Sequence, residues 1–331
     1  MEHRLDFVAI GDITTDSFIR LSGDEATVIE DGTRSKKICF NFGDKIEFDF
    51  VKDVYAVGNS PNAAVSASRI GLSSALVANL GDDALGDECI ASLTRDKVIT
   101  DFVARHKGMT SNHHYVLWYG AERTILVKHE AYPYTLPDIG TPSWLYLSSM
   151  GEHSLALHHD IARYLREHDG IKLTFQPGTF QMRFGKNELR DIYESTHLFF
   201  CNREEAARIL ETQERDIKML LQGIHDLGPR IVAITDGPDG AYTYDGAEML
   251  YIPMYPDIAP PVDRTGAGDA FASTFTALVA QGRTISEALI RAPINSMSVA
   301  QKIGAQEGLL TLEELETYLA QAPEWYKPKS I

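Results

Sequence analysis

The feature that most constrains the fold is a regular alternation of strands and helices that begins after Pro142. Short apolar runs, each typical of a buried strand, are separated by segments with helical spacing. The expected strands are Trp144–Leu147, Lys172–Phe175, His197–Cys201 and Ile231–Thr235, and the first expected helix is Ser154–Glu167. Repeated strand–helix units form a parallel sheet that is covered by helices on both faces. The sequence therefore predicts an α/β protein with a mainly parallel central sheet.

Segments on both sides of this region extend the same pattern. Phe7–Ile10 is expected to be a buried first strand, and Asn62–Ile70 a helix that ends at Gly71, a residue suited to a C-terminal cap. An antiparallel hairpin is expected around Asp245-Gly246, and only helices after it. The other expected elements are Ala75–Leu80 (strand), Asp83–Arg95 (helix), Ala241–Tyr244 and Met249–Ile252 (hairpin strands), and Ala267–Gln281, Ile285–Ile303 and Leu312–Ala322 (helices).

Two other regions have a different pattern, in which polar and apolar residues alternate as in two-sided hairpins. The first pairs Lys36–Phe42 with Lys45–Val51 around Gly43-Asp44, and the second pairs His113–Tyr119 with Thr124–His129 around Gly120-Ala121. We expect the two regions to form one small sheet that stands off the main body and serves as a lid. The lid would comprise residues 17–57 and 108–135 of a single domain that spans residues 1–331.

Charge and cysteine content restrict the class of protein. The formal net charge is −16, which argues against nucleic acid or an anionic membrane surface as a partner, because both are bound mainly through Lys and Arg. The negative charge of a bound nucleotide would have to be neutralised locally by backbone N–H groups, a metal ion or a few basic side chains. The three cysteines form no Cys-x-x-Cys pair, and the first residues lack the apolar run of a signal peptide. A reducing, cytoplasmic location is therefore expected.

The strongest chemical signal is the string Asp263-Arg264-Thr265-Gly266-Ala267-Gly268-Asp269-Ala270-Phe271. A Gly-x-Gly turn leads directly into an apolar helix, and glycines let the backbone approach a ligand closely. Consecutive N–H groups at a helix start form a cradle for an anion, which the helix dipole reinforces. Asp269 lies beside that cradle, where a carboxylate can accept a proton from an attacking hydroxyl. An acidic residue that only stabilises the helix start is the alternative, but it does not explain the whole string.

The string Asp263–Phe271 resembles the C-terminal signature of the ribokinase-like sugar kinases, the PfkB family, and the resemblance extends in order over nearly the whole chain. It implies a ribokinase-like fold of three layers. It also implies that Gly266, Ala267 and Gly268 form the anion hole for the transferred phosphoryl group and that Asp269 is the catalytic base. Asp263 would lie near the site of a monovalent cation, such as K⁺, that some members have.

Two segments resemble the positions where this family binds its substrate. Asp16 follows the first strand, and the resemblance implies that it binds substrate hydroxyls; an exposed turn aspartate is the alternative. In the segment 58–62, Gly58 would allow close approach of the substrate and Asn62 would point at it. A helix N-cap is the alternative for Asn62. Asn59 replaces a glycine of the family pattern, which leaves the identity of the substrate open.

Other segments resemble the nucleotide side of the family's active site. Asn202 and Glu205 would organise Mg²⁺-bound water and phosphate, although Asn-x-x-Glu is also a capping box. Thr235 and Gly237 belong to a loop that resembles the nucleotide-side loop, and an ordinary β-turn explains this loop nearly as well. Asn295, in a late helix, lies near the position where relatives place adenine.

The resemblance implies phosphorylation of a hydroxyl of a sugar or a nucleoside with ATP and Mg²⁺, by a chain that forms a homodimer. The substrate stays open between these classes. Gln176–Gly178 stands where many sugar kinases have Asp-Pro-Asn, and the nearby aromatic Phe180 favours a nucleoside base. Lys45 and Arg34, in contrast, favour a phosphorylated sugar.

Two other classes of protein agree less well with the sequence. A catalytically inactive, ligand-binding relative would not need the intact Asp269 and its glycine turn. A nucleotide-binding oxidoreductase would need a Gly-x-Gly-x-x-Gly fingerprint near Gly11, and the sequence has none there.

Overall fold

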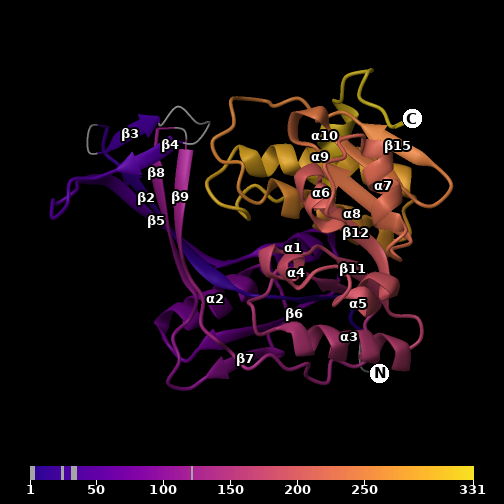
Figure 1. Ribbon diagram of the computed structural model, residues 1–331, viewed down its shortest axis with the longest axis horizontal. Helices are drawn as coiled ribbons and strands as arrows, with labels where there is room; N and C mark the ends of the chain where they lie inside the picture. Colours follow the sequence, from indigo (N-terminus) through magenta and orange to yellow (C-terminus); the bar gives the residue numbers. More distant parts are fainter. Residues whose placement is uncertain (1–3, 24–25, 31–35, 121) are drawn as a thin grey trace.

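The computed structural model describes residues 4–23, 26–30, 36–120 and 122–331 (Figure 1). Its large sheet has ten strands in the order β16 (Lys329–Ser330), β15 (Met249–Ile252), β14 (Ala241–Tyr244), β13 (Ile231–Thr235), β12 (Thr196–Asn202), β11 (Lys172–Phe175), β10 (Trp144–Leu147), β1 (Phe7–Ile10), β6 (Ser74–Gly81) and β7 (Val103–His106). From β13 to β7 all neighbouring strands are parallel, and β14, β15 and β16 complete the edge in antiparallel pairs. The predicted parallel sheet and the predicted hairpin near its end are confirmed.

Helices cover both faces of this sheet, because successive residues of a strand point to opposite sides. The helices are α1 (Asn59–Ile70), α2 (Ala84–Arg95), α3 (Leu155–Glu167), α4 (Thr179–Phe184), α5 (Arg190–Ser195), α6 (Arg203–Leu210), α7 (Ile217–His225), α8 (Ala267–Ala280), α9 (Ile285–Ala300) and α10 (Leu312–Ala320). Phe7 and Ala9 of β1 share one buried core with α1, α8, α9 and α10, whereas Val8 and Ile10 share the other with α3, α5, α6 and α7. The predicted three-layer α/β architecture is confirmed. None of the helices in the described ranges has the length and apolar character that crossing a membrane requires.

A four-stranded sheet, called the lid below, stands off from this body beside the lobe that contains α8, α9 and α10 (Figure 1). Its strand order is β5 (Phe48–Val57), β2 (Thr14–Leu21), β8 (His113–Tyr119) and β9 (Glu122–Lys128). β2 and β8 are parallel, and the two outer strands are antiparallel to their neighbours. The two regions that were expected to share one small sheet therefore do so, within the predicted lid ranges except for the first residues of β2.

The predicted pairing inside the first of these regions is wrong. β4 (Lys36–Cys39) pairs with β3 (Thr27–Glu30) in a separate two-stranded sheet, and β5 pairs with β2. An alternating pattern identifies a strand but not its partner, and β5 forms a longer ladder with β2 than a hairpin with β4 would allow. Arg34, and Ala121 of the second predicted turn, lie outside the described residues.

Helix α1 begins earlier than predicted, and this changes the position of a candidate site residue. The helix starts at Asn59, and Pro61 fits its first turn, where N–H groups have no helical partner. At the other end Gly71 has φ 106° and donates its N–H to the carbonyl of Ser68 at 3.0 Å, as expected for a C-terminal cap. Asn62 therefore lies inside the helix and is not its N-cap, so its side chain is available to other partners.

Candidate active site

The turn that precedes α8 depends on glycine at position 266. Gly266 has φ 80°, a left-handed conformation that favours glycine. A Cβ there would lie 2.7 Å from Cα of Ala305, in the loop between α9 and α10. Gly268, by contrast, has open space on its Cβ side and lines a cavity. Gly266 therefore allows the turn to pack against Ala305, and Gly268 leaves room for a ligand.

Unpaired backbone donors gather at the start of α8. Within the ranges that the structure describes, the N–H groups of Gly266, Gly268 and Asp269 have no hydrogen-bond partner, whereas the N–H of Ala267 donates to the carbonyl of Arg264 at 3.3 Å. Free N–H groups at a helix start, together with the helix dipole, attract an anion. The free donors of the predicted anion hole are thus those of its two glycines and of Asp269, and the amide of Ala267 closes the turn.

The carboxylate of Asp269 is held by three side-chain amides. Asn59 and Gln176 donate to its Oδ1 at 2.9 and 3.0 Å, and Asn62 donates to its Oδ2 at 2.9 Å. Removal of water by the surrounding protein raises the pKa of Asp269 above its usual value, and the three hydrogen bonds oppose that rise. The structure therefore holds a carboxylate in a defined orientation beside the free amides.

Two cavities meet at this turn. The first has an apolar wall and includes two residues predicted to contact the nucleotide; among its lining residues are Thr235, Gly237, Gly268, Met254, Phe271 and Met297. The second contains the carboxylate, and among its lining residues are Asp269, Asn59, Gln176, Asn202, Glu205 and Thr235. Thr235, Gly268 and Phe271 line both cavities. A phosphoryl group held at the start of α8 would thus lie between a ligand in the first cavity and a ligand beside Asp269.

Asn202 and Glu205 form the capping box that their spacing predicts. Oδ1 of Asn202 accepts from the N–H of Glu205 at 2.8 Å, and Oε2 of Glu205 accepts from the N–H of Asn202 at 2.9 Å. In the described part of the chain Oε1 of Glu205 has no hydrogen-bond partner, and both residues line the cavity of Asp269. Hard cations such as Mg²⁺ prefer oxygen ligands and retain water. The cap and the predicted role near Mg²⁺ are therefore compatible.

The structure corrects the predicted contact between Asn295 and adenine. Its side chain is fully buried: Nδ2 donates to Oγ1 of Thr274 at 2.7 Å, and Oδ1 accepts from the N–H of Leu310 at 2.9 Å. Adjacent helical residues point about 100° apart, and it is the neighbouring Ser296 and Met297 that line the first cavity. Asn295 joins α8, α9 and the loop after α9 instead.

The carboxylate of Asp263 is held by protein donors, and its predicted position near a monovalent cation stays a prediction. Oδ1 accepts from the N–H of Thr265 at 2.7 Å and lies 3.1 Å from Nη1 of Arg123, and Oδ2 accepts from the N–H of Gly304 at 3.0 Å. Arg123 comes from β9 and also donates to the carbonyl of Val262 at 3.0 Å. A guanidinium therefore supplies positive charge here and connects the lid to the start of the turn.

The residues predicted to bind substrate lie near the lid. Asp16 belongs to β2 and is not an exposed turn residue; its Oδ1 lies 3.2 Å from Nδ1 of His114 on β8. Gly58 has φ 128°, and a Cβ there would lie 2.6 Å from the carbonyl oxygen of Asp12, so glycine is needed for close backbone packing. Asn62 reaches Asp269. The structure brings Asn62 to the carboxylate of Asp269, whereas Asp16 lies beside a histidine of the lid.

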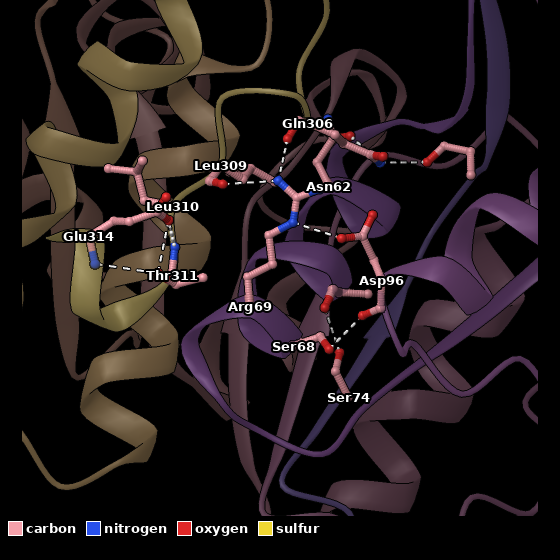
Figure 2. A network of polar contacts seen from close by, with 12 residues as sticks. Asn62, Ser68, Arg69, Ser74, Asp96, Gln306, Leu309, Leu310, Thr311 and Glu314 are labelled. Atoms are coloured by element: carbon pink, nitrogen blue, oxygen red, sulfur yellow. Dashed lines mark hydrogen bonds and ion pairs between the residues drawn. The ribbon is translucent and has the colours of Figure 1, made fainter.

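Three further residues at or beside the carboxylate were not predicted from the sequence: Asn59, Gln176 and Gln306. Figure 2 shows Gln306 beside Asn62, where its Nε2 donates to Oδ1 of Asn62 at 3.0 Å. No motif marks Gln306. Gln176 directly follows β11, and the carboxyl ends of parallel strands are where ligand-binding groups gather, so its position was a usable signal. Asn59 was interpreted only as a departure from a glycine pattern.

A three-layer α/β body with a small lid, and with a carboxylate beside free amides at a helix start, defines a kinase of small molecules. The chain belongs to the pfkB family of carbohydrate kinases, whose family model matches residues 52–312. That range includes α1, the glycine turn and Asp269.

Individual relatives agree with this assignment. The ribokinase of Bacillus subtilis is 28% identical over 277 residues, which are 80% of this chain and 87% of that protein. The nucleoside kinase of Methanocaldococcus jannaschii has a TM-score of 0.77 at 16% identity, covering 96% of this chain and 99% of that one. A putative ribokinase II from E. coli, in complex with ATP and Mg²⁺, has a TM-score of 0.75 at 18% identity with the same coverage. At these identities the solved structures establish the ribokinase-like fold.

Proposed function

We propose that this protein transfers the γ-phosphoryl group of ATP to a hydroxyl of a sugar or a nucleoside, with Asp269 as the catalytic base. The observation that carries the proposal is the position of the Asp269 carboxylate beside free N–H groups, at the point where two cavities meet. The matched relatives include a ribokinase and a nucleoside kinase, which supports both substrate classes. The intact base argues against an inactive, ligand-binding role.

The arrangement accounts for each part of such a reaction. The transition state of phosphoryl transfer is loose and carries negative charge on the equatorial oxygens, which the free amides of Gly266 and Gly268 would stabilise. As the acceptor oxygen bonds to the γ-phosphorus and the bond to ADP breaks, the proton of the acceptor hydroxyl passes to Asp269. Mg²⁺, when bound, would neutralise phosphate charge, with Glu205 placed to hold its water. The apolar wall of the first cavity suits the adenine base.

Consumption of ATP against a panel of acceptors tests this proposal. We expect ADP to form only when Mg²⁺ and a sugar or nucleoside are both present, and chelation of Mg²⁺ to abolish the reaction because the phosphate charge is then unopposed. Ribose, a pyrimidine nucleoside, a purine nucleoside and a phosphorylated sugar form the minimal panel. Binding of ATP without acceptor-dependent release of ADP in any arm would contradict the proposal and indicate an inactive relative.

We also propose a homodimer in which lids pair. β9 lies at the edge of the lid, and three successive apolar residues of this strand are exposed: Ile125 (47%), Leu126 (52%) and Val127 (59%). An exposed apolar edge strand is suited to pairing with another strand. Sedimentation is expected to give twice the mass of the chain, and Leu126→Lys to give the monomer. A monomeric wild-type protein would contradict this proposal.

A further inference from the structure

The three amides at Asp269 are divided unequally between its two oxygens. Among the residues that the structure describes, Oδ1 accepts from both Asn59 and Gln176, whereas Oδ2 accepts from Asn62 alone. Each oxygen of an ionised carboxylate offers about two acceptor positions. Oδ1 is therefore filled by protein donors, and the one position left for a further hydrogen bond is on Oδ2.

A tyrosine fixes the orientation of Gln176. The hydroxyl of Tyr146 donates to Oε1 of Gln176, so the donor group Nε2 must face Asp269. Tyr146 is fully buried on β10, the strand next to β11, and cannot easily swing away. The amide of Gln176 is thus held in the one orientation that donates to the carboxylate.

A longer series of contacts fixes Asn62 (Figure 2). Gln306 donates to Oδ1 of Asn62, which turns Nδ2 of Asn62 toward Asp269. The carbonyl of Gln306 accepts from Nη1 of Arg69 at 2.7 Å, and Nε of Arg69 donates to Oδ1 of Asp96 at 2.7 Å. The one described donor to Oδ2 therefore has a fixed direction, on a carboxylate that lines the second cavity.

We propose that Asn59 and Gln176 are positioning residues that hold Oδ1 of Asp269, so that Oδ2 is the oxygen that takes the proton of the acceptor hydroxyl. The proposal rests on the proposed function, with Asp269 as base. In the step, the O–H bond of the acceptor breaks and its proton bonds to Oδ2. The acceptor oxygen forms the new bond to the γ-phosphorus, and the electron pair of the broken P–O bond leaves on ADP. The side-chain amides of both residues meet at one atom, Oδ1 of Asp269.

The two amides also determine the pH range in which the base works. Asp269 accepts a proton only while it is ionised, and hydrogen bonds to the ionised form lower its pKa against the opposing effect of burial. Loss of either Asn59 or Gln176 removes a donor to the charged form, so the pKa of Asp269 rises further. The acid limb of the kcat profile, where the base becomes protonated, must then move to higher pH.

The variants Asn59→Gly and Gln176→Met test the proposal. Each is expected to move the acid limb of kcat upward by about one pH unit, a tenfold loss of kcat on that limb, with KM of the acceptor nearly unchanged. The matched control is Gln222→Met on α7, since Gln222 also donates to a carboxylate, Asp226, at 2.7 Å but on the surface. This control is expected to keep the wild-type profile. An unmoved acid limb in both Asn59→Gly and Gln176→Met would overturn the proposal.

A titration of carboxyl ¹³C resonances, with Asp269 assigned through Asp269→Asn, gives a readout that needs no turnover. The resonance of Asp269 is expected to titrate about one unit higher in both variants than in the wild type. If Gln176→Met fails to fold, Tyr146→Phe replaces it, since it removes only the bond that orients Gln176, and a smaller shift in the same direction is expected. If the wild type turns over but no variant shifts the pKa of Asp269, only the positioning role of Asn59 and Gln176 is refuted. If the wild type transfers phosphoryl to no acceptor, the proposed function is refuted as well.

Discussion

Replacement of Asp269 by asparagine is expected to lower kcat by about a thousandfold while KM for ATP and for the acceptor stays within about threefold. Asparagine has nearly the same shape as aspartate but cannot take the proton of the attacking hydroxyl, and a positioned base contributes about 10²–10⁴ to the rate. The substitution leaves the free N–H groups at the start of α8 intact, so binding and part of the rate remain. A fall in kcat without a rise in KM identifies a group that acts in the transition state.

The control for this substitution is Asp226→Asn. Asp226 also accepts a hydrogen bond from a glutamine amide, but it lies at the end of α7, away from both cavities. It is expected to show wild-type kinetics and a wild-type melting temperature. A near-normal kcat for Asp269→Asn would exclude Asp269 as the base. A large rise in KM for ATP at constant kcat would instead assign the residue to nucleotide binding.

The elements of the fold were predictable where they depend on local pattern. β10 and β11 have the predicted bounds because each is a short segment of mostly buried residues, with Lys172 at the start of β11 as the exposed exception. The pairing of β4 was not predictable in the same way, because it depends on a long-range contact. β5 forms a long ladder with β2, so β4 pairs with β3 instead. The start of α1 was missed because Asn62 is a good N-cap in isolation, whereas tertiary contacts make it a helical residue that reaches Asp269.

In the candidate site, too, residues within one local motif were predictable and residues from distant segments were not. The glycine turn and Asp269 lie within nine consecutive residues, so one motif contains them. Gln306 and Arg123 act from distant loops and strands, and no spacing rule connects them to Asn62 or Asp263. Their contribution appears only when the chain is folded, because each is a polar side chain that satisfies a buried partner.

Gly266→Ala is expected to lower the free energy of unfolding by about 3 kcal/mol and to reduce kcat/KM for ATP at least a hundredfold. Alanine at φ 80° is strained, and its Cβ would press on Ala305. Moving that loop disturbs the neighbouring Gly304, which donates to Asp263, and Gln306, which orients Asn62. One methyl group thus perturbs both the anion turn and the contacts of the base. Urea unfolding and steady-state kinetics measure the two effects.

Gly268→Ala separates the two reasons for glycine in this turn. A Cβ there meets nothing within 4 Å, and alanine favours a helix over glycine by about 1 kcal/mol. Its stability is therefore expected to equal or exceed that of the wild type, while the methyl group narrows the cavity and weakens ATP binding. Ala305→Gly, added to Gly266→Ala, removes the side chain that the new methyl meets and is expected to restore part of the lost stability. Equal destabilisation by Gly266→Ala and Gly268→Ala would show that packing against Ala305 does not distinguish the two glycines.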